Sequence, residues 1–161
     1  MATSCYVKLN KGIKGPVTTK GYEDHIEISN FNMGLAREIE SAVGGNKSRE
    51  TTAAQFLPIV LTKEYCVASP KLFLASVGPL DHEVEIKFVT TGDGKAETFV
   101  TWKLENVGIG GYHVNSGPDG KLMETITLHY DKITITHTGY GPDVTGTPET
   151  VGYDLKTRAK T

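Results

Sequence analysis

The chain has 161 residues, a formal net charge of −2 and a sequence pI near 6.2. This length predicts a single domain, 1–161, that buries about 68–70% of its unfolded surface, and this charge gives no electrostatic basis for binding nucleic acid. Neither the first residues nor any later segment carries an apolar run long enough for a secretory signal or a membrane span. We therefore expect a protein that folds in the cytoplasm and does not insert into a membrane.

The first ambiguous segment covers residues 35–54. Leu35, Ile39 and Val43 fall at helical spacing, and Gly44-Gly45 would end a short surface helix. On spacing alone, a surface helix followed by a loop is one reading of this segment.

The stretch 61–79 contains the clearest helix pattern of the chain. Ser69 can accept from the first free amides as N-cap, Pro70 suits the first helical position, and Gly78 ends the helix. The predicted helix, Pro70 to Val77, has about eight residues, fewer than the ~12–15 that an isolated helix needs in water. We therefore expect its apolar residues to pack on the rest of the domain. These residues are Leu72, Phe73, Leu74 and Val77.

Glycine-rich turns divide the rest of the chain into strand patterns. Gly92-Asp93-Gly94 predicts a β-hairpin, and Ser116 to Gly120 predicts another turn. The segment Gly139 to Pro148 leads to a short last strand near Val151 to Leu155. Residues 156–161 carry a small basic cluster, which we expect to be a flexible, solvated C-terminal tail.

Three strand patterns change phase near their middle. In each, apolar residues alternate on one face and then continue with the opposite parity. The changes follow Ile28, Leu104 and Tyr130, and the apolar residues resume at Phe31, Val107 and Ile133. Loops would break the pattern in the same way, but where a strand continues, a bulge or sharp bend absorbs the extra residue. The predicted fold is mainly β: two curled antiparallel sheets forming a small β-barrel, with one short α-helix.

Few residues point to chemistry. His129 and His137, with Asp131 between them, would be the best metal pair, but the phase change puts the two histidines on different faces. Cys5 and Cys66 are expected to be reduced, packed thiols. We predict no catalytic residues, no metal and no cofactor, and therefore no enzyme.

Trp102 lies in the apolar register between Val100 and Leu104. This position favours packing in the core over stacking on a ligand. We therefore group Trp102 with Ser69, Pro70 and Gly78 as residues with structural roles.

The stretch 61–79 resembles the strand-to-helix junction of the Hcp family, the haemolysin-coregulated proteins that form the inner tube of bacterial type VI secretion systems. Other segments match in the order and spacing that this family has. They are Ile13-Lys14-Gly15 with His25-Ile26-Glu27-Ile28, Phe31-Asn32-Met33-Gly34, Phe99 to Val107, Glu124 to Ile133, and Gly152-Tyr153-Asp154-Leu155. The resemblance covers about Cys5 to Leu155.

The resemblance implies a structural protein that assembles into rings of six, which stack into an expelled tube whose lumen can carry or shelter effector proteins. The implied partners are other copies of the chain, other secretion-system components and effectors. The implied route leads from the cytoplasm to the extracellular space or a target cell without a signal peptide. At residues 35–54 the resemblance implies a projecting arm that contacts neighbouring subunits or rings, in place of a surface helix.

Two groups of residues are candidates for contacts between subunits. The arm contributes Leu35, Arg37, Glu38, Ile39, Val43, Lys47 and Arg49. Val89 and Phe99 are added because they are apolar side chains on strand faces that are otherwise polar. The alternative function is a monomeric β-barrel or sandwich that binds a small ligand or carbohydrate through Tyr22, Tyr112 or Tyr140.

Overall fold

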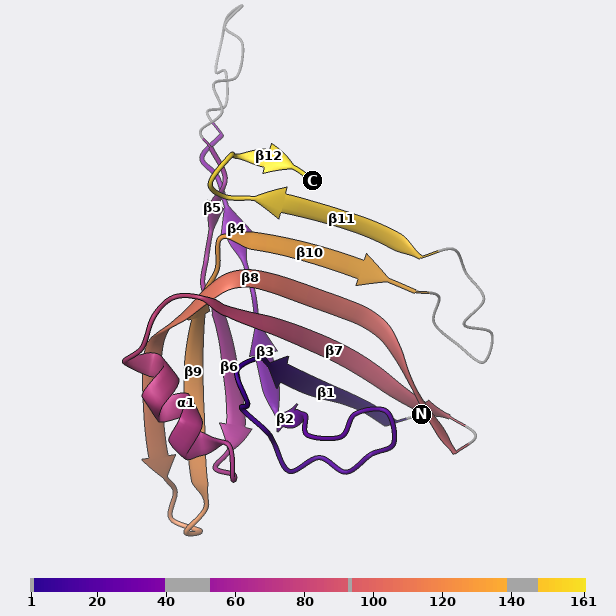
Figure 1. Ribbon diagram of the computed structural model, residues 1–161, viewed down its shortest axis with the longest axis vertical. Helices are drawn as coiled ribbons and strands as arrows, with labels where there is room; N and C mark the ends of the chain where they lie inside the picture. Colours follow the sequence, from indigo (N-terminus) through magenta and orange to yellow (C-terminus); the bar gives the residue numbers. More distant parts are fainter. Residues whose placement is uncertain (1, 40–52, 93, 139–147) are drawn as a thin grey trace, which may run out of the picture.

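The computed structural model describes residues 2–39, 53–92, 94–138 and 148–161 (Figure 1). These residues form twelve strands and one helix. In chain order they are β1 (Ala2–Leu9), β2 (Ile26–Ile28), β3 (Asn30–Asn32), β4 (Leu35–Ala36), β5 (Gln55–Phe56), β6 (Ile59–Glu64), α1 (Ser69–Ser76), β7 (His82–Gly92), β8 (Lys95–Ser116), β9 (Leu122–His129), β10 (Lys132–His137), β11 (Glu149–Asp154) and β12 (Ala159–Lys160). Within the described ranges, the helix α1 is not long and apolar enough to span a membrane.

Ten of the strands form two antiparallel sheets that share one strand. The first sheet has the order β12-β11-β10-β8-β7-β1-β2, and the second has the order β8-β9-β6-β3. The 22-residue β8 belongs to both: its first half pairs with β7 and β10, and residues 108–116 pair with β9. Figure 1 shows the two sheets curling away from each other along β8, with α1 lying over the second sheet.

The three phase changes mark the places where the chain passes from one sheet to the other. After Ile28, the chain leaves the first sheet through Ser29, whose N–H donates to the Thr62 carbonyl at 2.8 Å, and enters the second. After Leu104, β8 contains a register shift against β7, and Asn106 has φ 52°. After Tyr130, the chain returns from β9 to β10. The prediction of strongly curved sheets is confirmed.

The expected small β-barrel is not present. β2 pairs with β1 and β3 pairs with β6, and no ladder between described residues joins β2 or β12 to the second sheet. The mainly β class, the antiparallel sheets and the single short helix are confirmed.

One core fills the space between the two sheets. Ile59, Ile86 and Leu104 have no exposed surface, and residues from both sheets surround them. Trp102 is half-buried, packs against this core and lies 5.6 Å from the ring of Phe31, as its register predicts. The curvature of the sheets therefore serves one continuous core.

Helix α1 begins one residue earlier than expected, and this changes the role of Ser69. Ala68 holds the N-cap position without a side-chain cap, and Ser69 is the first helical residue, with its side chain buried. Pro70 lies in the first turn, and the helix ends just before Gly78, whose N–H donates to the Ala75 carbonyl at 3.2 Å. Ser69 is therefore not the N-cap.

Several apolar side chains of α1 and its C-cap remain largely exposed, although the Phe73 ring meets Tyr112 edge-on at 6.0 Å. Leu72 is buried, but Phe73, Leu74 and Val77 are 56%, 64% and 74% exposed. Because the helical period brings Ser69, Leu72 and Ala75 to one face, the residues between them point outward. Within the described residues, Leu72 is docked as expected, whereas Phe73, Leu74 and Val77 stay more than half exposed.

Two other segments, the start of residues 35–54 and the C-terminus, also differ from expectation. Leu35 and Ala36 pair with Phe56 and Gln55, so these residues form a strand and not the start of a helix. Residues 40–52 lie outside the described residues. At the C-terminus, β12 pairs with β11, and the Thr161 N–H donates to the Gly152 carbonyl at 3.0 Å. Ala159 and Lys160, within the expected tail of residues 156–161, form a short edge strand.

Candidate assembly surfaces and a buried polar network

The arm residues within the described ranges lie on the surface. Leu35 and Ile39 are 54% and 49% exposed, and Arg37 and Glu38 are also exposed. The β4–β5 ladder that carries Leu35 leaves the body of the two sheets at one end of the molecule (Figure 1). The other predicted arm residues, Val43, Lys47 and Arg49, lie outside the described residues.

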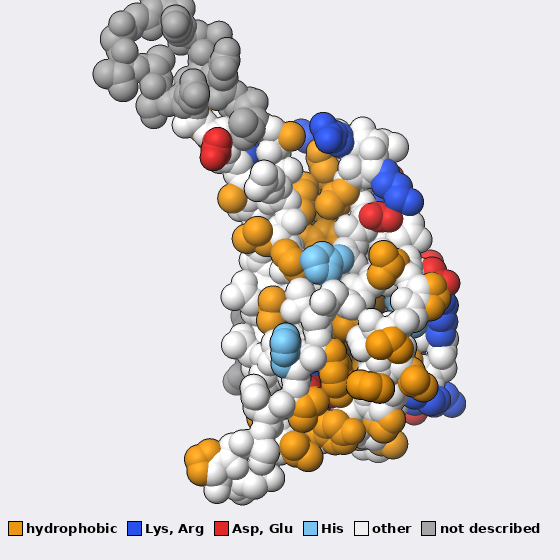
Figure 2. Space-filling view, turned by 90° about the vertical axis from the view of Figure 1, so that its left-hand side faces the viewer, with side chains coloured by type: hydrophobic (Ala, Val, Ile, Leu, Met, Phe, Trp, Pro, Cys, Tyr) orange, Lys and Arg blue, Asp and Glu red, His pale blue; other side chains and the backbone are white. Residues whose placement is uncertain are grey.

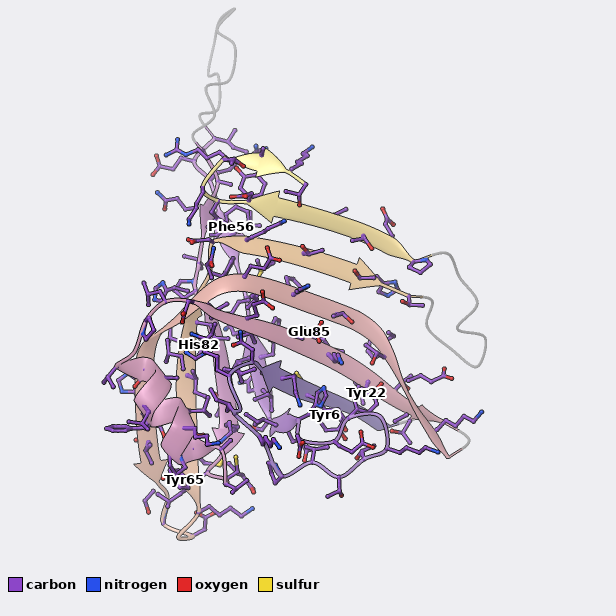
Figure 3. The ribbon with its side chains drawn as sticks, viewed as in Figure 1. Tyr6, Tyr22, Phe56, Tyr65, His82 and Glu85 are labelled. Carbon is purple, nitrogen blue, oxygen red and sulfur yellow. The ribbon has the colours of Figure 1, made fainter. Side chains whose placement is uncertain are left out.

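An apolar groove lies at the base of the β4–β5 ladder. Its volume is about 400 Å³, and its apolar lining includes Met33, Leu35, Phe56, Ile135, Val151 and Tyr153. Alternate residues of β10 and β11 supply one wall, since Ile133 pairs with Tyr153 and Ile135 pairs with Val151. The Phe56 ring stacks on Tyr153 at 4.9 Å and joins the ladder to that wall (Figure 3). Sequence reasoning did not bring these residues together.

A second apolar surface covers α1 and its flanks. It consists of Val67, Phe73, Leu74, Val77 and Leu80, each between 56% and 74% exposed, and is called the α1 surface below. Figure 2 shows hydrophobic side chains gathered over this part of the molecule. The predicted contact residues did not include any of these five.

Val89, a predicted contact residue, is buried within the chain. It is 1% exposed and packs with Tyr6 and Tyr22, whose rings lie 5.3 Å apart (Figure 3). A register shift between Phe88 and Val89 changes the alternation of β7 at this point, so the parity used to place Val89 outside no longer applies. Phe99 is half-buried on β8.

The most unusual polar feature is a buried ion pair between the two central strands of the second sheet. Lys63 on β6 and Glu124 on β9 are directly opposite each other, with side chains 1% and 0% exposed. Their charged groups are in contact. A buried charge is tolerated only when it is paired and hydrogen-bonded, so the groups around the pair decide its cost.

Four further hydrogen bonds satisfy this pair. The Ser69 hydroxyl donates to Glu124 Oε1 at 2.8 Å, and the Tyr112 hydroxyl donates to Glu124 Oε2 at 2.5 Å. Lys63 Nζ donates to the Ser69 Oγ at 3.2 Å and to the Glu64 carbonyl at 2.8 Å. Burial, followed by the hydrogen bond to Glu124, raises the pKa of Tyr112 far above its usual value, so this phenol remains a donor. The network ties α1 to three strands of the second sheet.

The network contains a serine beside a lysine and a carboxylate, which are also the parts of some catalytic sites. Ser69 has no exposed surface, and it also accepts from the Cys66 N–H at 2.9 Å. A hollow of about 550 Å³ lies nearby, lined by residues of β2 and by 63–67, but Ser69, Glu124 and Tyr112 are not among its lining residues. The arrangement joins segments of the fold and does not present a nucleophile to a substrate.

A pattern in the sequence could have revealed this pair. Lys63 continues the alternation of Ile59 and Leu61, and Glu124 precedes Ile126 and Leu128 with the same parity. A charged residue on a core-facing position needs a partner. Only the pairing of β6 with β9, which is not local in sequence, identifies that partner.

The histidines and cysteines of the described residues are spread over the fold, and His82 Nδ1 is buried without a hydrogen-bond partner among them. Within the described ranges, no three His, Cys, Asp or Glu side chains cluster as metal ligands. The ring of His129 lies against Gly110, where a Cβ would overlap it. Cys5 and Cys66 are free thiols, and burial raises the pKa of Cys5 to about 12.

The aromatic residues of the alternative ligand-binding function have other roles. Tyr22 is buried, and its hydroxyl lies 2.6 Å from the Thr98 hydroxyl. Tyr112 lies within β8 and is held by Glu124. Tyr140 lies outside the described residues. Neither Tyr22 nor Tyr112 is therefore a free aromatic side chain in a loop.

The fold and these surfaces define a mainly β protein with apolar side chains that the described residues leave exposed. The sequence profile of the family described as "Type VI secretion system effector, Hcp" matches residues 6–137. The chain therefore belongs to the Hcp family of type VI secretion proteins. The comparison with curated proteins gave no match.

Solved structures agree with this assignment. The chain is similar to a structure described as a type six secretion system protein, with a TM-score of 0.85 and 26% identity, covering 99% of this chain and 100% of that one. It is also similar to Hcp1 from Salmonella typhimurium, with a TM-score of 0.77, 16% identity and full coverage of both chains. The secreted protein Hcp3 from Pseudomonas aeruginosa has a TM-score of 0.68 and 24% identity, covering 92% of this chain and 97% of that one.

Proposed function

We propose that this protein is the tube subunit of a type VI secretion system, in which six copies form a ring and the rings stack into an expelled inner tube. The carrying observation is the β4–β5 ladder, which leaves the body of the molecule with Leu35 and Ile39 about half exposed. A second subunit that covers these side chains would remove them from water. The family assignment supports the same function.

The proposed role is structural and not enzymatic. The Ser69 hydroxyl, the potential nucleophile of the buried network, is fully buried and engaged with Glu124. The proposed partners are identical subunits, stacked rings, other components of the secretion system and effectors held in the lumen. The proposed route is folding in the cytoplasm followed by export without a signal peptide.

Native mass measurement and negative-stain imaging test the ring. We expect a species of six times the chain mass and ring-shaped particles at tens of micromolar protein. A monodisperse monomer without rings under these conditions would refute the proposal.

A second experiment tests the arm. Replacing residues 38–49 with a short Gly-Ser linker should leave a cooperatively folded protein, because loop-closure entropy changes slowly with loop length. The same variant should form rings or stacks less readily and should not support secretion. A variant that stacks and supports secretion like the parent would show that the arm does not make these contacts, and an unfolded variant would show that the segment belongs to the core.

A further inference from the structure

We infer that the α1 surface is a contact site for a second copy of this chain. This inference rests on the proposed assembly into rings and names a surface that the arm does not include. Figure 1 shows α1 at the lower end of the molecule, away from the β4–β5 ladder, and Figure 2 shows hydrophobic side chains gathered on the face that includes this end.

The described part of the protomer covers these side chains only in part: the Phe73 ring meets Tyr112 edge-on, 6.0 Å between centroids, and is still 56% exposed. The inner face of α1 is made by Ser69, Leu72 and Ala75, and the Ser69 hydroxyl is bound to Glu124. A helix on a protein surface usually carries polar residues on its outer face, and a helix that is apolar all round is usually buried. Here the outer face carries Phe73 and Leu74, so the helix has the composition of a buried one while only half of it is covered.

The exposed area is large enough for a subunit contact. With the lower end of the 150–250 Å² known for aromatic side chains taken as the scale for all five residues, they expose about 500 Å² together. The largest apolar patch of an ordinary monomer is about 300–600 Å², and each partner of a stable complex contributes about 800 Å². The α1 surface alone would supply most of one side of such a contact.

The charges around α1 favour a protein partner over a membrane. Lys71 is the one charged residue of the helix, and its Nζ donates to the Gly12 carbonyl at 2.8 Å. Asp81, just beyond Leu80, is paired with Lys11. The centre of a protein interface is depleted of charged residues, whereas a helix that binds a membrane surface carries a strongly basic face. The net charge of −2 also gives no attraction to anionic lipids.

A second copy is the partner that ring formation requires. The contacts of a closed ring are heterologous, so each subunit must offer two different surfaces. The α1 surface supplies one of these, in addition to the contacts proposed for the arm.

The test introduces charge into the surface without touching the inner face of the helix. Leu74→Glu and Val77→Glu, singly and together, should raise the protein concentration at which half of the rings dissociate by at least about tenfold, because a buried carboxylate without a partner is costly. Leu122→Glu is a nearby control outside the α1 surface, since Leu122 is 45% exposed at the start of β9, where its carbonyl accepts from the Tyr65 N–H at 3.0 Å. Dissociation is followed by native mass measurement over a dilution series, and folding by thermal unfolding of the dilute monomer.

The outcomes separate this inference from the proposed function. If the parent forms rings and the double variant forms them with the same dilution midpoint, the α1 surface is not a contact and the inference fails alone. If the parent remains a monomer, the proposed function fails and the inference fails with it. Flotation of the parent with phosphatidylglycerol vesicles, lost in the double variant, would also overturn the inference in favour of a membrane. Should the glutamate variants not fold, Leu74→Ser with Val77→Ser provides the same measurement.

Discussion

Removing the buried carboxylate of Glu124 should strongly destabilise the protein. Glu124→Ala leaves the Lys63 ammonium group in a site where its side chain is 1% exposed, and it also removes the acceptor of Ser69 and Tyr112. Breaking a buried ion pair from one side costs about 3–5 kcal/mol. For a chain of this size each kcal/mol lowers the melting temperature by about 2–4 °C, so the expected fall is about 6–20 °C.

Urea and thermal unfolding measure this loss, at one protein concentration low enough to keep every variant monomeric, since association raises apparent stability. The control is the double variant Lys63→Met with Glu124→Leu, which removes both charges and keeps most of the volume. It should recover most of the stability lost by Glu124→Ala, because no charge is left unpaired. A loss below about 1 kcal/mol for Glu124→Ala, or an equal loss for the double variant, would contradict the view that the unpaired ammonium group is what destabilises the protein.

Three further predictions follow from single residues. Gly15→Ala should lower the melting temperature much more than Gly92→Ala. A Cβ at Gly15 would overlap the His25 carbonyl, whereas a Cβ at Gly92 would meet nothing within 4 Å. Equal effects of the two variants in thermal unfolding would contradict this prediction. Burial raises the pKa of Cys5 to about 12, so its alkylation at pH 8, followed by mass spectrometry, should be slow in the native protein and fast in urea. Burial also lowers the pKa values of His25 and His82, so both histidines protonate more readily in the unfolded chain. Their contribution to stability should be full above about pH 6.5 and should fall as the pH drops below this value. A urea midpoint that stays constant from pH 7.5 to 5.5 would be inconsistent with this prediction.

Features that depend on neighbours in sequence were predictable. The phase changes after Ile28, Leu104 and Tyr130 correctly located the passages between the sheets, because strand alternation has a period of two and a single slip is visible locally. The start and end of α1 were also correct to within one residue, because Pro70 and Gly78 restrict the backbone directly.

Features that depend on distant contacts were not predictable in the same way. An eight-residue helix with apolar residues on both its buried and its exposed face has no clear amphipathic pattern, and its buried face, with Ser69 bonded to Glu124 and Leu72 and Ala75 packed inward, depends on distant contacts. Val89 was placed on the wrong side of β7 because the ladder with β8 has a register shift between Phe88 and Val89. The alternation of residues along β7 does not show this shift. The pairing of Leu35 with Phe56 joins residues across an intervening segment, which helical spacing cannot reveal.

The shared strand β8 has a mechanical consequence for the proposed tube wall. Its 22 residues run unbroken through the bend at Asn106, with β7 and β10 bonded to one half and β9 bonded to the other. A load applied to the β8–β9 hairpin is therefore transmitted into the first sheet along a covalent backbone, and does not rely on side chains sliding past one another. Two sheets joined by packing alone can shear, whereas two sheets that share a strand must deform together. Each subunit would then resist the force of expulsion as a single stiff element.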